Sequence, residues 1–135
     1  MKPTRITANL VGMMLFVQVI LGGGAVLLGW PVIYHFVWGG ITFAVLIAAT
    51  LLAARDYSRQ STIFKVGTAA VVDFIIQIIL GYFALSSDVT VVIHLTNAFV
   101  LGVFTTYLIS FADSAEKTRA VISRAAAAGS SLRPS

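Results

Sequence analysis

The chain has 135 residues, of which 59% are hydrophobic and 10% are charged, and its formal net charge is +4. Ordinary globular domains carry about 25% charged residues. Here residues 6–54 contain no charge, and residues 66–112 contain only Asp73 and Asp88. Such stretches exclude a soluble domain and predict an integral membrane protein. The absence of cysteine excludes disulfides, iron–sulfur clusters, thiolate metal sites and covalent attachment of haem through Cys-x-x-Cys-His.

Four transmembrane helices are predicted in chain order. A helix needs about 20 apolar residues to cross a bilayer, and each charge-poor block is a little over twice that length. Gly29-Trp30-Pro31 interrupts the first block, since proline disfavours helix in the residue before it, and Ser86-Ser87-Asp88 interrupts the second. We therefore expect spans at about 7–29, 32–54, 64–85 and 90–112.

The basic residues predict how the chain sits in the membrane. All nine lie before the first span, between the second and third spans, or after the fourth. This distribution is typical of cytoplasmic loops and does not indicate nucleic-acid binding. We expect a cell-membrane protein with a cytoplasmic N-terminus (1–6), a four-helix transmembrane domain (7–112) and a cytoplasmic tail (113–135). Within that tail we expect a short surface helix from Ser114 to Ala128.

An internal repeat relates the two apolar blocks. The segment from Gln18 to His35 aligns without a gap with the segment from Gln77 to His94, and seven of the 18 positions are identical. We therefore predict an all-α bundle of two tandem helical hairpins, at about 7–54 and 64–112, related by a pseudo-twofold axis along the membrane normal. The second helix of each hairpin would then lie on a diagonal of the bundle.

The two histidines of the chain are equivalent positions of this repeat, and they form the leading candidate site. His35 and His94 should lie at the same depth on opposite sides of the bundle axis, an arrangement that suits two axial ligands of one planar haem. Interhelical hydrogen bonding is the alternative for each ring. Zinc would need three or four ligands, and only Asp88 lies near this level.

Four further residues of the repeat are weaker candidates for the same pocket. Gly22 and Gly81 leave room for a porphyrin face or, alternatively, allow close helix packing. Gln18 and Gln77 lie nearer the middle of the membrane, where hydrogen bonding between helices is the main alternative to a role beside the haem.

Asp73 breaks the symmetry of the repeat. It precedes Gln77 by one helical turn, at a depth where a carboxylate is costly, and its repeat partner is Met14. It is a candidate for proton transfer or for binding a quinol. Alternatively, the Asp73 carboxyl is protonated and neutral, or it faces a water-filled vestibule.

The pattern Gln-x-x-Leu-Gly, followed seventeen residues after the glutamine by histidine, resembles the haem A synthase family of cytochrome oxidase assembly proteins. Residues 18–35 and 77–94 carry the match. The resemblance implies one four-helix half of the usual eight-span protein, with His35 and His94 as axial haem ligands. This sequence departs from the family's catalytic half, which has a glutamate shortly before its first histidine and often an arginine directly after that histidine. No glutamate precedes Glu116, and phenylalanine follows His35.

These patterns lead to one principal expectation and two alternatives. We expect one non-covalent haem b bound through His35 and His94, serving electron transfer or haem handling in a respiratory chain. The enzyme alternative is a compact haem A synthase that hydroxylates haem O, although its expected glutamate is missing. The remaining alternative is a haem-free scaffold subunit of a larger respiratory complex. Expected partners are haem and the lipid bilayer, with quinone or other respiratory membrane subunits as further candidates.

Overall fold

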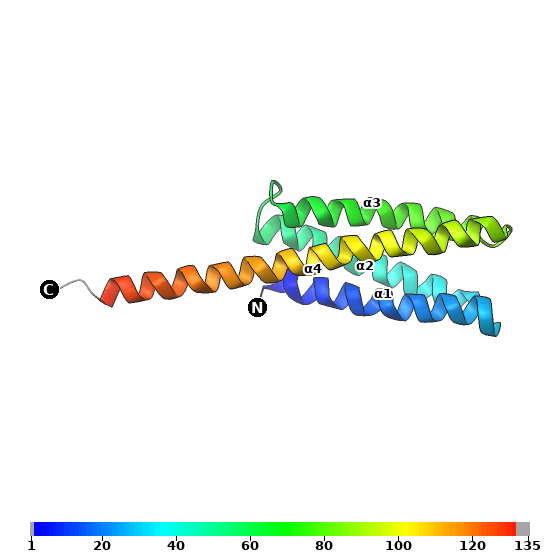
Figure 1. The fold of residues 1–135 in the computed structure, drawn as a ribbon, viewed down its shortest axis with the longest axis horizontal. Coiled ribbons are helices and arrows are strands. Elements are labelled where there is room, and N and C mark those ends of the chain that lie inside the picture. Colours follow the sequence, from blue (N-terminus) through cyan, green and yellow to red (C-terminus); the bar gives the residue numbers. More distant parts are fainter. Residues whose placement is uncertain (1, 132–135) are drawn as a thin grey trace.

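The structure is a computed structural model that describes residues 2–131. It contains four helices: α1 (Pro3–Leu28), α2 (Val32–Asp56), α3 (Thr62–Phe83) and α4 (Asp88–Ser131) (Figure 1). The described residues contain no strand. Each helix is long and apolar enough to cross a membrane. The prediction of an all-α chain with four potential transmembrane helices is therefore confirmed.

The helix ends follow from local sequence. Pro3 occupies the first turn of α1, where its missing N–H costs nothing. Gly29 ends α1 in the left-handed conformation (φ 69°), and the Trp30 N–H then donates to the Gly24 carbonyl oxygen at 3.1 Å. At the start of α3 the Ser61 hydroxyl accepts a hydrogen bond from the Phe64 N–H at 3.3 Å. The two connections predicted as hairpins are short, at residues 29–31 between α1 and α2 and residues 84–87 between α3 and α4.

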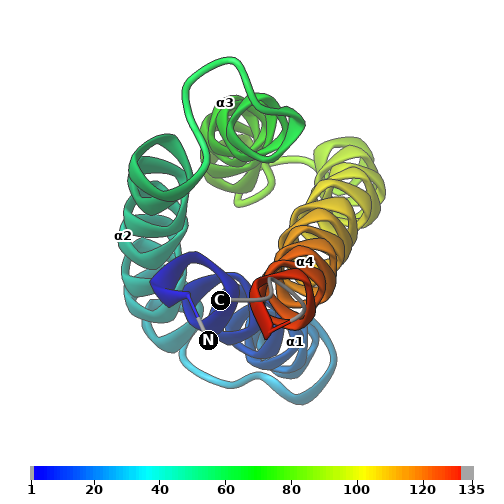
Figure 2. The same ribbon diagram turned by 90° about the vertical axis from the view of Figure 1, so that its left-hand side faces the viewer.

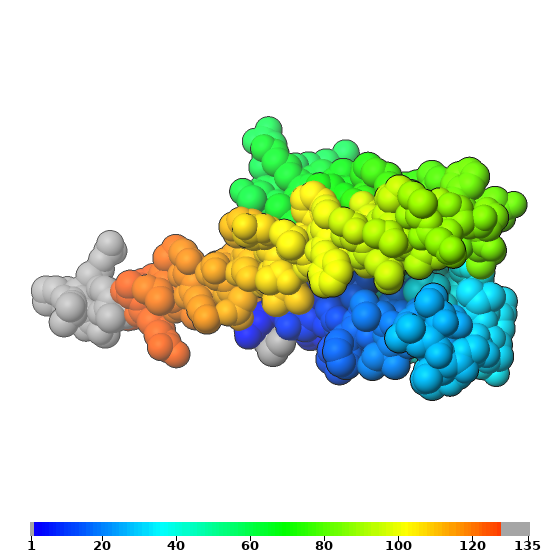
Figure 3. All heavy atoms as spheres, turned by 45° about the vertical axis from the view of Figure 1, so that its right-hand side comes forward, coloured from blue at the N-terminus to red at the C-terminus, as the bar shows by residue number. Residues whose placement is uncertain are grey.

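The helices form a ring in which each contacts two neighbours. Viewed end-on, the order around the ring is α1, α2, α3, α4 (Figure 2), and contacts join each adjacent pair. Among the described residues, no Cα atoms of the diagonal pairs α1/α3 and α2/α4 lie within 8 Å of each other. In the space-filling view α4 lies between α3 and α1 and continues past both (Figure 3). Only side chains can therefore meet across the bundle.

The hydrophobic core lies toward the end of the bundle that carries the termini. All four helices contribute to it, and alanines at several positions let the helices approach closely. The fully or nearly fully buried members are Ala8, Val11, Leu46, Ala49, Ala53, Ile63, Ala70, Phe74, Leu101 and Leu108. The histidine region lies outside this cluster, toward the hairpins. The bundle therefore has an apolar, closely packed half and a half with polar interior side chains.

Ionic contacts join the helices at the end of the bundle that carries the N-terminus and the loop between α2 and α3, which is the basic end. The Arg5 guanidinium on α1 contacts Asp113 Oδ1 at 2.6 Å and Glu116 Oε2 at 2.8 Å, both on α4. The Thr4 hydroxyl donates to Asp56 Oδ2 on α2 at 2.7 Å. These contacts join α1 to the last turn of α2 and to the segment of α4 that follows its apolar part.

The tail differs from the sequence prediction. Residues 114–128 are helical, as expected, but they are not a short helix of their own, because α4 continues unbroken to Ser131 and projects beyond the other helices (Figure 1). The reason lies in the sequence, since residues 113–128 contain neither glycine nor proline and are rich in alanine, a strong helix former. Residues 132–135 of the predicted tail lie outside the described residues.

Candidate functional site

Each hairpin contains the same clasp between a glutamine and a histidine. In α1–α2 the Gln18 side-chain amide donates to the His35 carbonyl oxygen at 3.0 Å and lies 3.1 Å from His35 Nε2. In α3–α4 the Gln77 amide donates to the His94 carbonyl oxygen at 3.0 Å and lies 3.3 Å from His94 Nε2. The residues that the repeat singles out are therefore brought together in pairs, one pair in each hairpin.

The second nitrogen of each ring fixes its tautomer. His35 Nδ1 lies 3.1 Å from the Gln18 carbonyl oxygen, and His94 Nδ1 lies 3.1 Å from the Gln77 carbonyl oxygen. A carbonyl oxygen only accepts, so Nδ1 carries the proton in both rings. The lone pair of each neutral ring is then on Nε2, where it accepts an N–H of the glutamine amide.

Gly22 and Gly81 allow the rings to lie against the neighbouring helix. A Cβ atom on Gly22 would lie 2.9 Å from His35 Cε1, and one on Gly81 would lie 3.0 Å from His94 Cε1. Any larger residue would therefore push the ring away. The glycines act first by making room for the histidine rings, which is closer to the packing interpretation than to a bare porphyrin surface.

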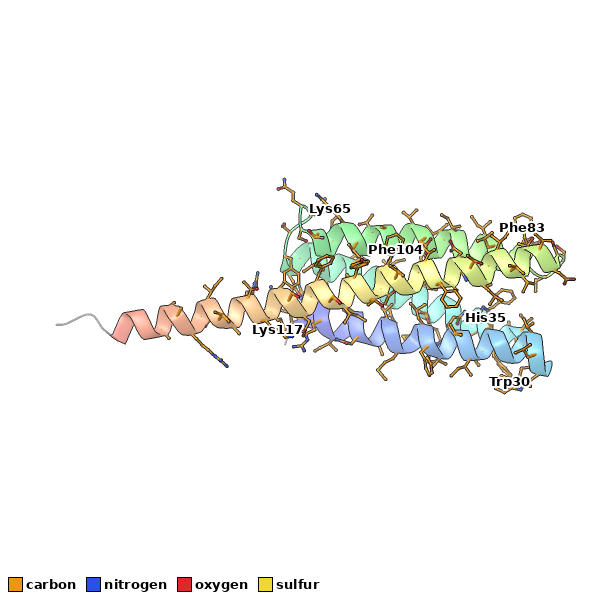
Figure 4. All side chains as sticks on the ribbon, in the orientation of Figure 1. Trp30, His35, Lys65, Phe83, Phe104 and Lys117 are labelled. Carbon is orange, nitrogen blue, oxygen red and sulfur yellow. The ribbon has the colours of Figure 1, made fainter. Side chains whose placement is uncertain are left out.

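The two histidines meet across the bundle. They come from the diagonal helices α2 and α4, yet their ring centroids are 6.1 Å apart and the ring planes make an angle of 72°. Figure 4 places His35 nearer the end marked by Trp30 and Phe83 than the basic end marked by Lys65. The expected juxtaposition of His35 and His94 is thus present in the geometry.

One helical turn from the clasps, on the side nearer the basic end, the two hairpins differ. In α1–α2 the Trp38 indole N–H donates to the Met14 carbonyl oxygen at 2.9 Å. In α3–α4 the equivalent positions are Asn97 and Asp73, and the Asn97 amide donates to Gln77 Oε1 at 2.9 Å. Asp73 is 7% exposed, and the Asn97 side chain lies beside its carboxyl. Asn97 therefore extends the second clasp toward Asp73.

Asn97 and Trp38 were missed as site residues. The repeat aligns them with each other, and Asn97 lies one helical turn after His94 on the same face of α4. A polar amide in an apolar span and its spacing from His94 are signals that could have identified it.

Other features do not provide a competing site. Within residues 2–131 no group of three or more His, Asp or Glu side chains is placed to hold a metal ion. A groove of about 640 Å³ between α1 and α4 is mostly apolar, with Met14, Phe16, Trp38 and Ile109 in its lining. This composition fits a surface in contact with lipid better than a site for acid–base chemistry.

Comparisons with protein-family models, curated proteins and solved structures find no match to the chain. The resemblance to the haem A synthase family therefore stays a prediction based on residues 18–35 and 77–94.

Proposed function

We propose that the bundle binds one non-covalent b-type haem through His35 and His94 and serves electron transfer or haem handling in a respiratory chain. The distance between the two rings is the observation that carries this proposal. The ring centroids of His35 and His94 are 6.1 Å apart although the rings come from diagonal helices. Two imidazoles this close are within reach of one metal centre that they would hold between α2 and α4.

The tautomers of the rings also suit the proposal. A histidine that binds a metal commonly donates its other N–H to a carbonyl or carboxylate oxygen, which orients the ring and increases its basicity. Both Nδ1 atoms have such a partner in the backbone of the neighbouring helix. An iron atom at Nε2 would replace a single hydrogen bond from a glutamine amide. That amide would keep its second bond, to the histidine carbonyl oxygen.

The ligand set favours electron transfer. His35 and His94 would both hold the haem, and ligation by two histidines favours electron transfer over oxygen binding. When bound, the haem would supply a one-electron redox couple. The chain would hold the iron between α2 and α4, orient both imidazoles through backbone carbonyls and keep bulk water away with apolar helices. No cysteine is needed for this mode of attachment.

The haem spectrum tests the proposal. The protein should be expressed with ample haem and purified in detergent, and a pyridine-haemochrome spectrum should be recorded. We expect b-type haem in the wild type and in Asp88→Asn, which changes a residue at the start of α4. We expect none in the double variant His35→Ala/His94→Ala. A colourless wild-type protein would refute haem binding.

A haem-free scaffold is the second candidate, and the glutamine clasps favour it. Each ring already has hydrogen-bond partners for both nitrogens within its own hairpin. Buried polar groups paired in this way stabilise helix association in membranes without a cofactor. This candidate predicts that the wild type stays colourless and that both histidine variants mainly lose stability.

A further inference from the structure

The second hairpin contains a polar connection that the first lacks. It begins at the buried Asp73 carboxyl, beside which the Asn97 side chain lies. The Asn97 amide also donates to Gln77 Oε1 at 2.9 Å, and the Gln77 amide donates to the His94 carbonyl oxygen at 3.0 Å, the bond that it would keep with iron at Nε2. Asp73 is therefore connected to His94 through two amide side chains.

The carboxyl group of Asp73 has spare hydrogen-bonding capacity. Asp73 is 7% exposed, and its Oδ2 atom is buried with no hydrogen-bond partner among residues 2–131. A negative charge on this oxygen has no donor to stabilise it, whereas a proton on Oδ2 removes the charge. The position therefore suits a group that gains or loses a proton when the nearby charge changes.

Few charged groups compete for this role. Helices α2 and α4 pack against α3. Between the hairpin end and the basic end, the titratable side chains of α2 are Tyr34 and His35, and those of α4 are His94 and Tyr107. Tyr34 and Tyr107 are largely exposed on the outer surface. The histidine pair is therefore the titratable neighbour of Asp73 inside the bundle.

We propose that Asp73 is a proton-binding site coupled to the histidine pair, so that one proton binds its carboxylate when one electron enters a haem held by His35 and His94. This inference rests on the proposed function. Reduction by a one-electron donor of the ferrocytochrome class would convert ferric to ferrous iron while the donor iron becomes ferric, and no bond to the iron forms or breaks. The proton comes from the aqueous phase and forms an O–H bond at Asp73 Oδ2.

The coupling follows from electrostatics inside an apolar bundle. An electron added at the histidine pair would interact with the Asp73 carboxylate through an apolar interior, in which charges are screened less than in water. The added electron therefore increases the affinity of the carboxylate for a proton. Asn97 and Gln77 lie between Asp73 and His94. His35 has no equivalent connection, because its hairpin has Met14 and Trp38 at the corresponding positions.

Buried threonines extend the polar interior from the level of Asp73 toward the basic end. Thr42, Thr50 and Thr105 are buried, and each hydroxyl donates to the carbonyl oxygen four residues earlier in its own helix. Their oxygen atoms can still accept hydrogen bonds.

A redox titration tests the coupling. The midpoint potential of the haem-loaded protein should be measured against pH for the wild type, Asp73→Asn and the matched control Asp88→Asn. We expect the wild-type and Asp88→Asn potentials to fall with increasing pH, up to about 59 mV per unit for one proton per electron. We expect Asp73→Asn to be independent of pH. If Asp73→Asn does not retain haem, Asp73→Glu, which keeps a carboxyl, should retain haem and show a potential that falls with increasing pH.

Each outcome of this titration has one meaning. A wild-type protein without haem refutes the proposed function, and the coupling with it. Haem with a potential independent of pH in the wild type refutes the coupling alone. A pH dependence that persists in Asp73→Asn also refutes it, because another group would then bind the proton. An infrared carbonyl band of a protonated carboxylic acid that appears on reduction of the wild type, and not of Asp73→Asn, would support it.

Discussion

The two hairpins of the bundle share one clasp and differ one turn below it. Gln18–His35 and Gln77–His94 have matching hydrogen bonds, to within 0.2 Å at Nε2. Below them, Met14 and Trp38 in the first hairpin replace Asp73 and Asn97 in the second. The comparison separates two roles. The repeated glutamine–histidine pairs bring two imidazoles close together. The positions that differ place a carboxyl group, that of Asp73, in the second hairpin only.

Removing a histidine should have the largest effect. We expect His35→Ala and His94→Ala each to abolish the low-spin absorption spectrum of the haem, because under the proposed ligation each ring would supply one of the two bonds to the iron. The two variants should behave alike, since this part of the hairpins is shared. Absorption spectroscopy of the purified variants checks this. A variant that keeps the low-spin spectrum would show that its ring is not a ligand.

Filling the glycine positions should displace the rings. Gly22→Ala and Gly81→Ala place a Cβ atom about 3 Å from a ring carbon, and we expect them to weaken haem binding and to cost about 1–3 kcal/mol in stability. Gly23→Ala and Gly102→Ala are matched controls, because a Cβ atom there has no neighbour within 4 Å. Haem titration and thermal unfolding measure both effects. Equal behaviour of Gly22→Ala and Gly23→Ala would contradict the predicted contact.

The glutamines should reveal the asymmetry. Gln77 accepts an additional hydrogen bond from Asn97 that Gln18 lacks. Gln77→Leu leaves the Asn97 amide without that acceptor, and we expect it to destabilise the bundle by about 1–3 kcal/mol. Gln18→Leu should cost less. Unfolding in a detergent series compares the two variants, and an equal loss would show that the bond from Asn97 contributes nothing.

The smallest effect is expected at the basic end, far from the clasps. The Arg5 guanidinium, which hydrogen-bonds to Glu116, lowers the pKa of the Glu116 carboxyl. A lowered pKa in the folded state means that the contact stabilises the protein above the ordinary pKa of glutamate and is lost as pH falls through the lowered value. Glu116→Gln should therefore reduce the Tm slightly at neutral pH and flatten its dependence on acidic pH. An unchanged acid branch would contradict this contribution.

Much of the fold could be predicted because it depends on local composition. Runs of apolar residues specify the spans, and Gly29 and Pro31 specify the first hairpin. The unbroken continuation of α4 was not foreseen, because the break expected near residue 112 rested on a change from apolar to charged residues. Such a change marks a membrane boundary and need not end a helix.

The site could be predicted only in part. The repeat identified Gln18, His35, Gln77 and His94 as a set, but not that each glutamine would bond to the histidine of its own hairpin. That bond depends on side-chain rotamers and on the distance between helices, which a sequence pattern does not specify. Asn97 was missed because its repeat partner is Trp38, so a search for identical residues passes over it.

The most direct test of the central claim is the haem content of the wild-type protein. Pyridine-haemochrome absorbance should be combined with quantitative amino-acid analysis of the same sample. We predict one b-type haem per chain, because His35 and His94 of a single chain would ligate one iron. A ratio near zero would contradict haem binding, and a ratio near one half would contradict ligation within one chain.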